Sequence, residues 1–251
     1  MQHEPTRFNC VGCGACCKGR FIPLTLLEAR QWLERGHDVA ILLEAFKQLH
    51  WPASEQEYQH SLLRSAQVSC GNTHVQVTAI FAANALAQCP NLQADDLCSI
   101  YDERPLVCRI YPMEINPFIE LKPQDKDCPR EAWEHGEIIA SATGSDSSLN
   151  SLIQVSRLAD RADARAKIAI CNRLGINVAA WKAEALVIQF PARELLLEAI
   201  NAEEPIPESG TQALGRWKLR VAQSSLGEAL ARGELALDDA ESVDYVFHAL
   251  R

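Results

Sequence analysis

The chain has 251 residues, a formal net charge of −9 at pH 7, 47% hydrophobic residues and 23% charged residues. This composition is typical of a globular protein in water, and the length allows one large domain or two modest ones. The acidic charge argues against broad nucleic-acid binding. No secretion signal and no apolar stretch of bilayer length is evident, so we expect a cytoplasmic protein that makes no membrane contact.

The first third of the chain predicts helices followed by a strand. Thr25 and Asp38 are each placed to cap a helix with an apolar face, and Gly36 is placed to end the first of these. A third helix is predicted in "SEQEYQHSLLRSAQ", which begins at Ser54. The alternating, β-branched stretch "HVQVTAIF" predicts a strand near residues 74–81.

The middle of the chain is predicted to be loop, and the second half helix. Residues 88–129 contain six prolines, with one short strand predicted at "FIELK". From residue 130 onward the composition favours helices. The helix-forming stretches are "EAWEHGEIIASA", "SLNSLIQVSRLADRADARAKIAICNRLG", "NVAAWKAEALVIQF", "PARELLLEAINAE" and "ALGRWKLRVAQSSLGEALARGEL".

These elements predict an α+β fold that is mainly α. We expect a cysteine-rich metal-binding head with a few short strands in residues 1–130 and a helical region in residues 131–251, which can also pack together as one unit. The boundary follows the change of composition near residue 130.

Cysteine is concentrated in the first of these regions. Nine of the ten cysteines precede residue 131, and four of them lie within the eight residues "CVGCGACC". In a reducing compartment, clustered cysteines are more often metal ligands than disulfides. The candidate ligands are Cys10, Cys13, Cys16, Cys17, Cys89, Cys98, Cys108 and Cys128.

The spacing of the first four cysteines indicates a metal-binding turn. Cys10, Cys13 and Cys16 form C-x2-C-x2-C, and Gly14 can adopt a positive φ that leaves backbone N–H groups free to point at sulfur. The adjacent side chains of Cys16 and Cys17 are expected to diverge, so that one of them faces a second site or further ligands.

Eight thiols make two sets of four. That number fits two tetrahedral metal sites, one iron–sulfur cluster with one zinc, or one four-cysteine site with spare thiols. The C-x2-C-x2-C run and the Cys-Pro pairs at Cys89 and Cys128 favour a [4Fe–4S] cluster, whereas a knuckle with a remote pair favours zinc. Both cofactors remain open, with a slight preference for iron–sulfur.

Four basic residues lie near the candidate ligands and can offset thiolate charge. They are Lys18, Arg20, Arg104 and Arg109. The alternative is that they are solvated surface residues, and that Arg104 only pairs with its acidic neighbours within the loop.

The sequences "CVGCGACC" and "CSIYDERPLVCRIYP" resemble the YkgJ-type cysteine cluster family, which is described as zinc- or iron-chelating domains with a CxxCxxCC signature. The residues that carry the resemblance are Cys10, Cys13, Cys16, Cys17, Cys98, Tyr101, Arg104, Pro105, Cys108, Arg109 and Pro112. The resemblance covers roughly residues 7–130. It implies zinc or iron–sulfur binding and leaves the activity open.

Other interpretations are weighed against metal binding. Disulfides are disfavoured because no secretion signal is evident. A thioredoxin-like thiol pair is disfavoured because Cys10 follows only a short polar segment and no strand. An enzyme similar to flagellin lysine-N-methylase, with methyl transfer or redox activity, is an alternative, although no nucleotide, zinc-protease or hydrolase motif is found. A zinc-stabilised adaptor that binds a protein partner through residues 131–251 is another.

The remaining cysteines are predicted to be structural. Cys70 and His74 are interpreted as part of a turn before the predicted strand, with a buried thiol, in preference to a role as ligands. Cys171 lies in an apolar helical pattern and is predicted to be in the core.

Overall fold

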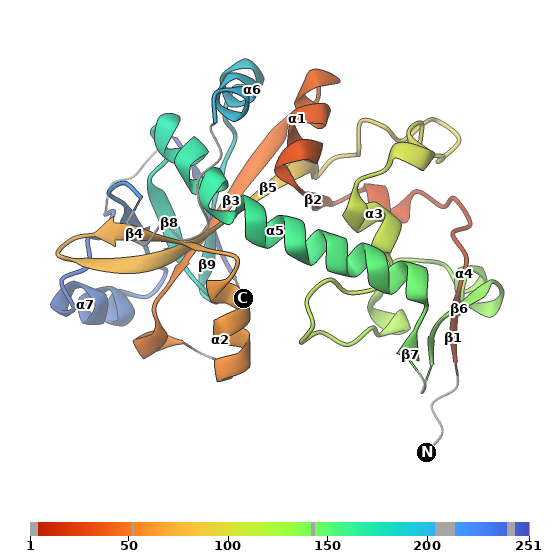
Figure 1. Ribbon diagram of the computed structural model, residues 1–251, viewed down its shortest axis with the longest axis horizontal. Coiled ribbons are helices and arrows are strands. Elements are labelled where there is room, and N and C mark those ends of the chain that lie inside the picture. Colours follow the sequence, from red (N-terminus) through yellow and green to blue (C-terminus); the bar gives the residue numbers. More distant parts are fainter. Residues whose placement is uncertain (1–4, 52, 142–143, 204–213, 240–243, 251) are drawn as a thin grey trace. The chain divides into compact units, whose positions relative to one another are not determined.

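The computed structural model describes residues 5–51, 53–141, 144–203, 214–239 and 244–250 (Figure 1). The chain divides into two compact units, and each is built from two separate stretches of sequence. We call Met1–Leu24 with Ala83–Ala159 the cysteine unit, and Thr25–Ala82 with Asp160–Arg251 the sheet unit. The division predicted from composition, at residue 130, stays a prediction.

A small antiparallel sheet begins and ends the cysteine unit. Strand β1 (Thr6–Phe8) pairs with β6 (Glu137–Ser141), and β6 pairs with β7 (Gly144–Ser145). The short helix α4 (Glu131–Glu134) packs against β1, where the rings of Phe8 and Trp133 lie 4.9 Å apart (Figure 1). These contacts fix the segment that leads into the cysteine loop.

The rest of the cysteine unit is mostly loop, as predicted from its prolines. It contains strand β2 (Arg20–Leu24), helix α3 (Leu106–Ile110) and the 3-10 turns η1 (Ala15–Cys17), η3 (Tyr101–Glu103) and η4 (Pro123–Asp125). Helix α3 packs against β2. The strand predicted at residues 118–122 is wrong: this segment has no regular secondary structure, and Phe118 and Ile119 are exposed.

The described strands of the sheet unit form a mixed sheet. They are β3 (Val39–Phe46), β4 (Ala66–Cys70), β5 (Thr73–Ala85), β8 (Val178–Trp181), β9 (Ala185–Gln189), β10 (Lys218–Arg220) and β11 (Val246–Ala249). The strand order is β10-β8-β3-β5-β2, with β4 beside β5 and β9 beside both β3 and β11. Parallel pairing joins β8 to β3 and β10, and the β4–β5, β3–β9 and β9–β11 pairs are antiparallel.

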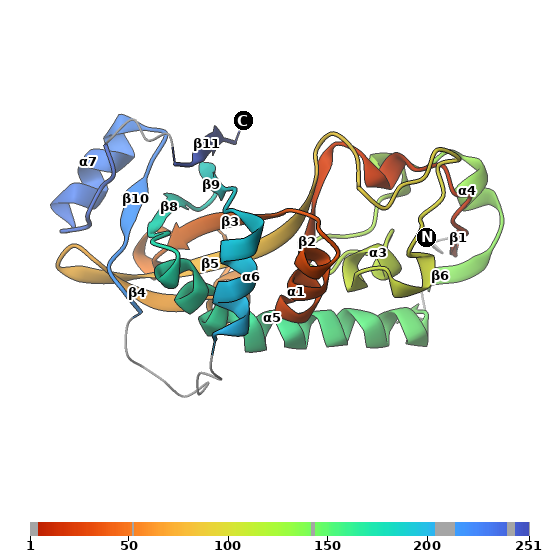
Figure 2. The ribbon, with the colours of Figure 1, turned by 90° about the horizontal axis from the view of Figure 1, so that it is seen from above.

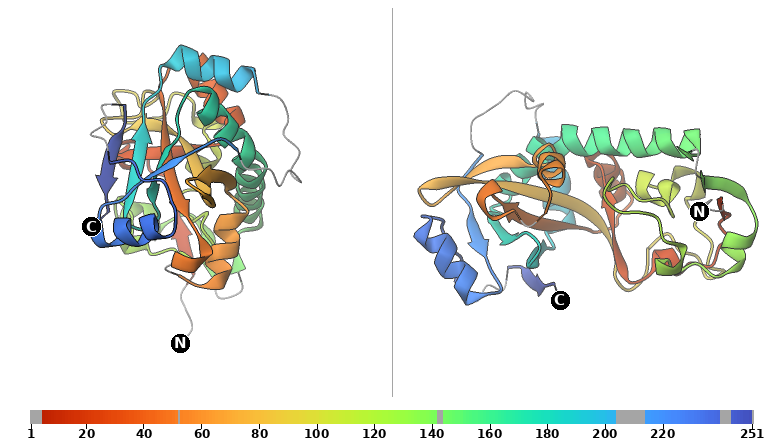
Figure 3. Two further views of the ribbon diagram at one scale, coloured as in Figure 1. Left: turned by 90° about the vertical axis from the view of Figure 1, so that its left-hand side faces the viewer. Right: turned by 90° about the horizontal axis from the view of Figure 1, so that it is seen from below.

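The sheet unit also contains helices. They are α1 (Leu26–Glu34), α2 (Glu55–Leu62), the second part of α5 (Ser147–Arg173), α6 (Arg193–Asn201) and α7 (Ser224–Arg232). Helices α1 and α6 lie side by side (Figure 2), and α5 is one continuous helix (Figure 3). None of the described helices is long and apolar enough to span a bilayer.

The helix predicted from the Thr25 cap and the helix predicted in "SEQEYQHSLLRSAQ" are confirmed, whereas the helix predicted from Asp38 is wrong because residues 39–46 form strand β3. Thr25 accepts a hydrogen bond from the Glu28 backbone N–H while the Glu28 carboxylate accepts from Thr25, and Ser54 and Glu57 repeat this arrangement at α2. Helices α5 and α6 also form where they were predicted.

The prediction that the fold is mainly α, with a helical second half, is wrong. The protein is α+β with about 26% strand and 36% helix, and eight strands of the described residues form one sheet. The apolar stretch 39–46 is strand β3, whose side chains are nearly all buried, and residues 178–189 form β8 and β9. A short apolar run that is buried on both faces has no alternation to distinguish a strand from a helix.

Two further helix predictions are only partly correct. The stretch after Glu131 forms one turn of helix and then strand β6, because Gly136 takes a φ of +114°. The last predicted helix forms strand β10 before α7. Ala142 and Ala213, at ends of predicted helices, lie outside the described residues.

Candidate metal centre

The cysteine loop turns sharply at two glycines. Gly12 and Gly14 have φ values of +68° and +66°, which L side chains rarely adopt. The 3-10 turn η1 follows at once, with the Cys17 N–H donating to the Gly14 carbonyl at 3.0 Å. The predicted left-handed conformation of Gly14 is confirmed, and it sets Cys16 and Cys17 on one tight turn.

A second loop, residues 89–99, lies directly against the first. The Cys89 N–H donates to the Cys17 carbonyl at 2.7 Å, so the two backbones touch. Leu92 and Cys98 form an isolated antiparallel bridge, and the Ser99 N–H donates to the Asn91 carbonyl at 2.8 Å. This narrow loop therefore brings Cys89 and Cys98 to the same side of the cysteine unit as the first loop.

The last two candidate ligands come from α3 and from the loop after η4. The Cys108 N–H donates to the Pro105 carbonyl at 2.9 Å in the first turn of α3. The Cys128 sulfur lies 3.3 Å from the Tyr111 hydroxyl. All eight candidate ligands thus lie in the cysteine unit.

Electrostatic interactions link these eight thiols into one set. Cys16 interacts with Cys17, Cys89, Cys108 and Cys128, while Cys98 interacts with Cys108, and Cys10 and Cys13 interact with Cys128. We call Cys10, Cys13 and Cys128 the outer group, and Cys17, Cys89, Cys98 and Cys108 the inner group. Cys16 faces members of both groups.

Three sulfurs of this set share hydrogen bonds. The Cys16 and Cys17 sulfurs are 3.9 Å apart, so the expectation that these neighbours diverge is not what the structure shows. A hydrogen bond from Cys17 lowers the pKa of Cys16 to about 6, and Arg20 and Arg104 add to this effect. A hydrogen bond from Cys17 also lowers the pKa of Cys89 to about 6. Hydrogen bonding to Cys17 therefore favours the thiolate form of both Cys16 and Cys89.

Two further thiols, those of Cys108 and Cys128, are harder to ionise. Burial, together with the charges of Cys16 and Cys89, raises the pKa of Cys108 to about 12. Burial raises the pKa of Cys128, although the Tyr111 hydroxyl acts in the opposite direction. A bound metal ion would supply the positive charge that lets all of these sulfurs ionise.

The four predicted basic residues differ in their surroundings. Lys18 pairs with Asp96 at 3.0 Å, and Arg20 pairs with Asp127, the residue before Cys128. The Arg104 guanidinium stacks 3.6 Å from the Tyr101 ring centroid and donates to the Tyr101 carbonyl.

Their roles beside the thiols also differ. Arg20 and Arg104 both favour the Cys16 thiolate, whereas the side chain of Arg109 is exposed. Of the four basic residues, Arg20 and Arg104 are therefore the two whose positive charge is seen to stabilise a thiolate.

Two polar residues beside the thiols were missed in the sequence. Tyr111 reaches Cys128, and Asn91, only 6% exposed, lies close enough to Cys89 for its backbone and side chain to favour the thiolate. Each follows a recognisable motif, Tyr111 after "CRI" and Asn91 after Cys89-Pro90. This closeness in sequence to a cysteine is the only sign of their role that the sequence contains, because both contacts depend on the tertiary fold.

The remaining cysteines lie in the sheet unit. Cys70 and Cys171 are both fully buried, and the Cys70 sulfur lies 3.5 Å from the Ala236 carbonyl oxygen. His74 is exposed on β5. The interpretation of Cys70 and Cys171 as core residues agrees with these positions.

The eight cysteines are chemically suited to bind a metal through thiolates, and their positions fit such a centre in part. Within the described residues, no three His, Cys, Asp or Glu side chains meet around one point as they would around a single ion. However, the buried Asn91 Nδ2 has no acceptor at hydrogen-bond distance among the described residues. A metal-bound thiolate or an inorganic sulfide next to Cys89 would supply one.

The loops, the clustered thiols and the adjacent guanidinium groups define a metal-chelating cysteine domain. Residues 9–129 match the family model CxxCxxCC, described as a putative zinc- or iron-chelating domain. The match includes all eight candidate ligands. No curated protein and no solved structure matches the chain.

Proposed function

We propose that the cysteine unit is a redox module with two metal sites. In this proposal Cys10, Cys13, Cys16 and Cys128 hold a [4Fe–4S] cluster, and Cys17, Cys89, Cys98 and Cys108 hold a second metal, zinc or iron. The observation that carries the proposal is the position of Cys16, which interacts with the outer group through Cys128 and with the inner group through Cys89.

The outer group supports the cluster assignment. Cys10 and Cys13 are exposed and interact with Cys128, which precedes Pro129. Adding Cys16 completes C-x2-C-x2-C with a distant Cys-Pro, which is the ligand pattern of ferredoxin-type clusters. Each thiolate of a cluster binds its own iron, so the sulfurs of a cluster need not converge on one point.

The inner group supports a second, more protected site. Cys89 is buried, and Cys17, Cys98 and Cys108 are half-buried. The backbone hydrogen bond between Cys89 and Cys17 holds two of these ligands together before any metal binds. Four thiolates with no open position are typical of structural metal sites.

The surrounding residues would lower the charge of the loaded module. Arg20 and Arg104 act on Cys16, at the border between the two groups. The buried Asn91 amide can donate to a sulfur of the inner group. When bound, an iron–sulfur cluster supplies one-electron transfer.

The test is metal analysis of protein purified without oxygen. Wild-type protein should contain ~4 iron atoms and ~4 acid-labile sulfides per chain, with visible absorption that dithionite bleaches, and a second metal besides. Cys13→Ser should remove the iron and sulfide, whereas Cys98→Ser should remove the second metal and keep the cluster.

Cys70→Ser is the matched control, because a serine hydroxyl can still donate to the Ala236 carbonyl. This variant should keep both metals. A colourless wild-type protein without sulfide would overturn the cluster assignment. If Cys13→Ser and Cys98→Ser lost the same metal to the same extent, the division into two sites would be wrong.

A further inference from the structure

Tyr111 is held rigidly beside one of the proposed ligands. Its backbone N–H donates to the Val107 carbonyl at 3.1 Å, at the end of α3. Its ring meets the Phe8 ring edge-on at 6.2 Å, and the Lys126 ammonium lies 5.5 Å from its centroid. With the backbone and ring fixed in this way, the hydroxyl has a defined position, 3.3 Å from the Cys128 sulfur.

Lys126 is itself fixed. Its ammonium pairs with Glu114 and its side chain is only 15% exposed. Lys126 and Cys128 belong to the same segment, which is extended after η4. Tyr111 therefore contacts this segment twice, through Lys126 on the ring and through Cys128 on the hydroxyl.

Cys128 needs such support more than the other proposed ligands of its site. Cys10, Cys13 and Cys16 share one turn that Gly12 and Gly14 shape. Cys128 arrives from a distant part of the sequence, in a segment without regular secondary structure. Hydrogen bonds from neighbouring groups commonly orient metal ligands and tune the metal that they bind.

We propose that Tyr111 is a positioning residue of the metal centre, whose hydroxyl donates a hydrogen bond to the Cys128 thiolate and holds it as the fourth ligand of the outer site. This inference rests on the proposed function. A donor at a ligand sulfur withdraws electron density, so it would also raise the reduction potential of a cluster.

The hydroxyl is available as a donor. A tyrosine hydroxyl carries a proton that it can donate, and this one lies 3.3 Å from the Cys128 sulfur. In the opposite assignment Tyr111 would itself bind the metal as a tyrosinate. The two roles differ in what a phenylalanine at this position would do, because a lost ligand removes metal and a lost hydrogen bond does not.

The experiment compares Tyr111→Phe with wild type in the full chain, purified without oxygen. Metal content is measured, and the alkylation rate of each cysteine is followed by mass spectrometry. We expect Tyr111→Phe to retain its metal and to alkylate Cys128 about tenfold faster, since one hydrogen bond to a charged group is worth about 1.5 kcal/mol. Cys98 should react at the wild-type rate, which excludes a general loosening of the fold. Any cluster present should shift to a lower potential.

Tyr101→Phe is the matched control, because Tyr101 is 49% exposed and its ring, not its hydroxyl, stacks with Arg104. Equal alkylation of Cys128 in Tyr111→Phe and wild type would overturn the inference, and so would loss of metal from Tyr111→Phe. The metal content of wild type tests the proposed function separately, because the ratio of alkylation rates is measured whether or not iron is present.

Discussion

Gly12 and Gly14 set how closely the cysteine loop approaches the loop that carries Cys98. A Cβ atom at Gly12 would lie 2.8 Å from a Leu97 methyl carbon, and one at Gly14 would lie 2.8 Å from an Asp96 carboxylate oxygen. Real Cβ contacts are longer than this, so a side chain at either position must displace the Leu97 or the Asp96 side chain. The two glycines therefore allow the close contact between the cysteine loop and the second loop.

Gly14→Ala is predicted to reduce metal binding. The left-handed backbone would cost about 1–2 kcal/mol, and the new methyl group would displace Asp96 from its pair with Lys18. Gly19→Ala is the matched control, because its φ is +72° but nothing lies within 4 Å of the added Cβ. Metal per chain should fall further in Gly14→Ala than in Gly19→Ala. Equal loss in both variants would mean that backbone strain, and not the close approach, is responsible.

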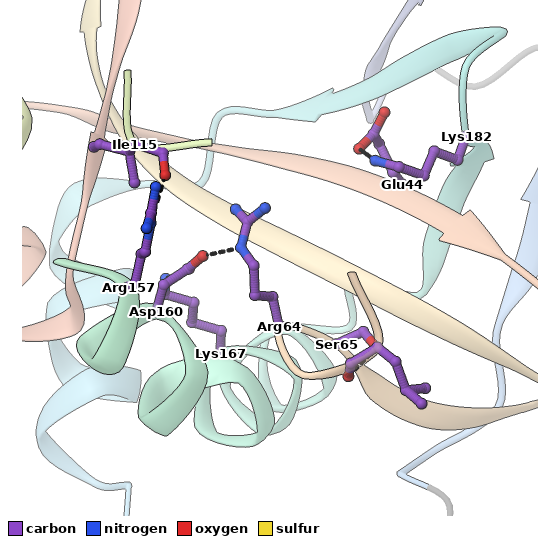
Figure 4. Close-up of polar contacts among 9 residues, drawn as sticks. Glu44, Arg64, Ser65, Ile115, Arg157, Asp160, Lys167 and Lys182 are labelled. Atoms are coloured by element: carbon purple, nitrogen blue, oxygen red, sulfur yellow. Dashed lines mark hydrogen bonds and ion pairs between the residues drawn. The ribbon is translucent and has the colours of Figure 1, made fainter. Parts of the chain in front are cut away.

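At the scale of elements, an ion cluster on α5 joins separate parts of the sheet unit. Asp160 on α5 pairs with Arg64, which follows α2, and at 3.2 Å with Lys167, about two turns further along the helix (Figure 4). Asp163 accepts a hydrogen bond from the Leu26 N–H at the start of α1, at 2.8 Å. The side chain of Lys167 is only 3% exposed, so these carboxylates take the place of water around its ammonium group.

The same cluster makes the stability of the sheet unit sensitive to acid. Burial alone would raise the pKa of Asp160, but Lys167 and Arg64 together lower it below its usual value. A lowered pKa means that the stabilisation is present above the unfolded pKa of about 3.9 and is lost as pH falls through the folded value. The contribution of Asp160 should therefore be constant near neutral pH.

Asp160→Asn is predicted to destabilise the sheet unit by about 3 kcal/mol, since it leaves a buried lysine without its nearest carboxylate. The value is at the low end for a broken buried pair because Asp163 still acts on Lys167. Denaturant unfolding at pH 7 measures the change. Glu228→Gln, which removes an exposed pair with Arg232 on α7, should leave the midpoint unchanged. A similar small effect in both variants would contradict the role of the cluster.

How much of the fold could be predicted depends on whether an element is fixed locally. Helix α1 was predicted from the Thr25 cap and α2 from its helix-forming sequence, and both begin with a capping box whose partners are only three positions apart. Strands β3, β8 and β9 were not, because their partners are distant in sequence and burial on both faces removes the alternation that marks a strand.

The same distinction between local and long-range contacts applies to the candidate site. The eight cysteines could be selected from the sequence, because their residue type and spacing are local properties. Their grouping could not, since it depends on contacts such as the one between Cys89 and Cys17. Tyr111 and Asn91 were missed because neither residue type is a usual marker of a cysteine site.

At the scale of the whole molecule, the two units differ in what holds them together. Large and fully buried side chains are concentrated in the sheet unit, where they include Trp217, Phe46, Phe81, Ile41 and Leu43. Among the largest such side chains in the described residues, Ile110 alone belongs to the cysteine unit. A unit with so small an apolar core requires another source of stability. In small metal-binding domains the free energy of metal binding contributes directly to the free energy of folding.

Removal of metal is therefore predicted to unfold the cysteine unit and to leave the sheet unit folded. After incubation with a strong chelator, hydrogen exchange should become fast in residues 100–130, where metal ligands stand in place of a core. Protection should persist in β3 (Val39–Phe46) and in β4 (Ala66–Cys70), whose ladders lie in the apolar core of the sheet unit. Chelator-treated Cys70→Ser should behave like treated wild type. If both ranges lost protection together, or neither did, the stability of the cysteine unit would not depend on its metal.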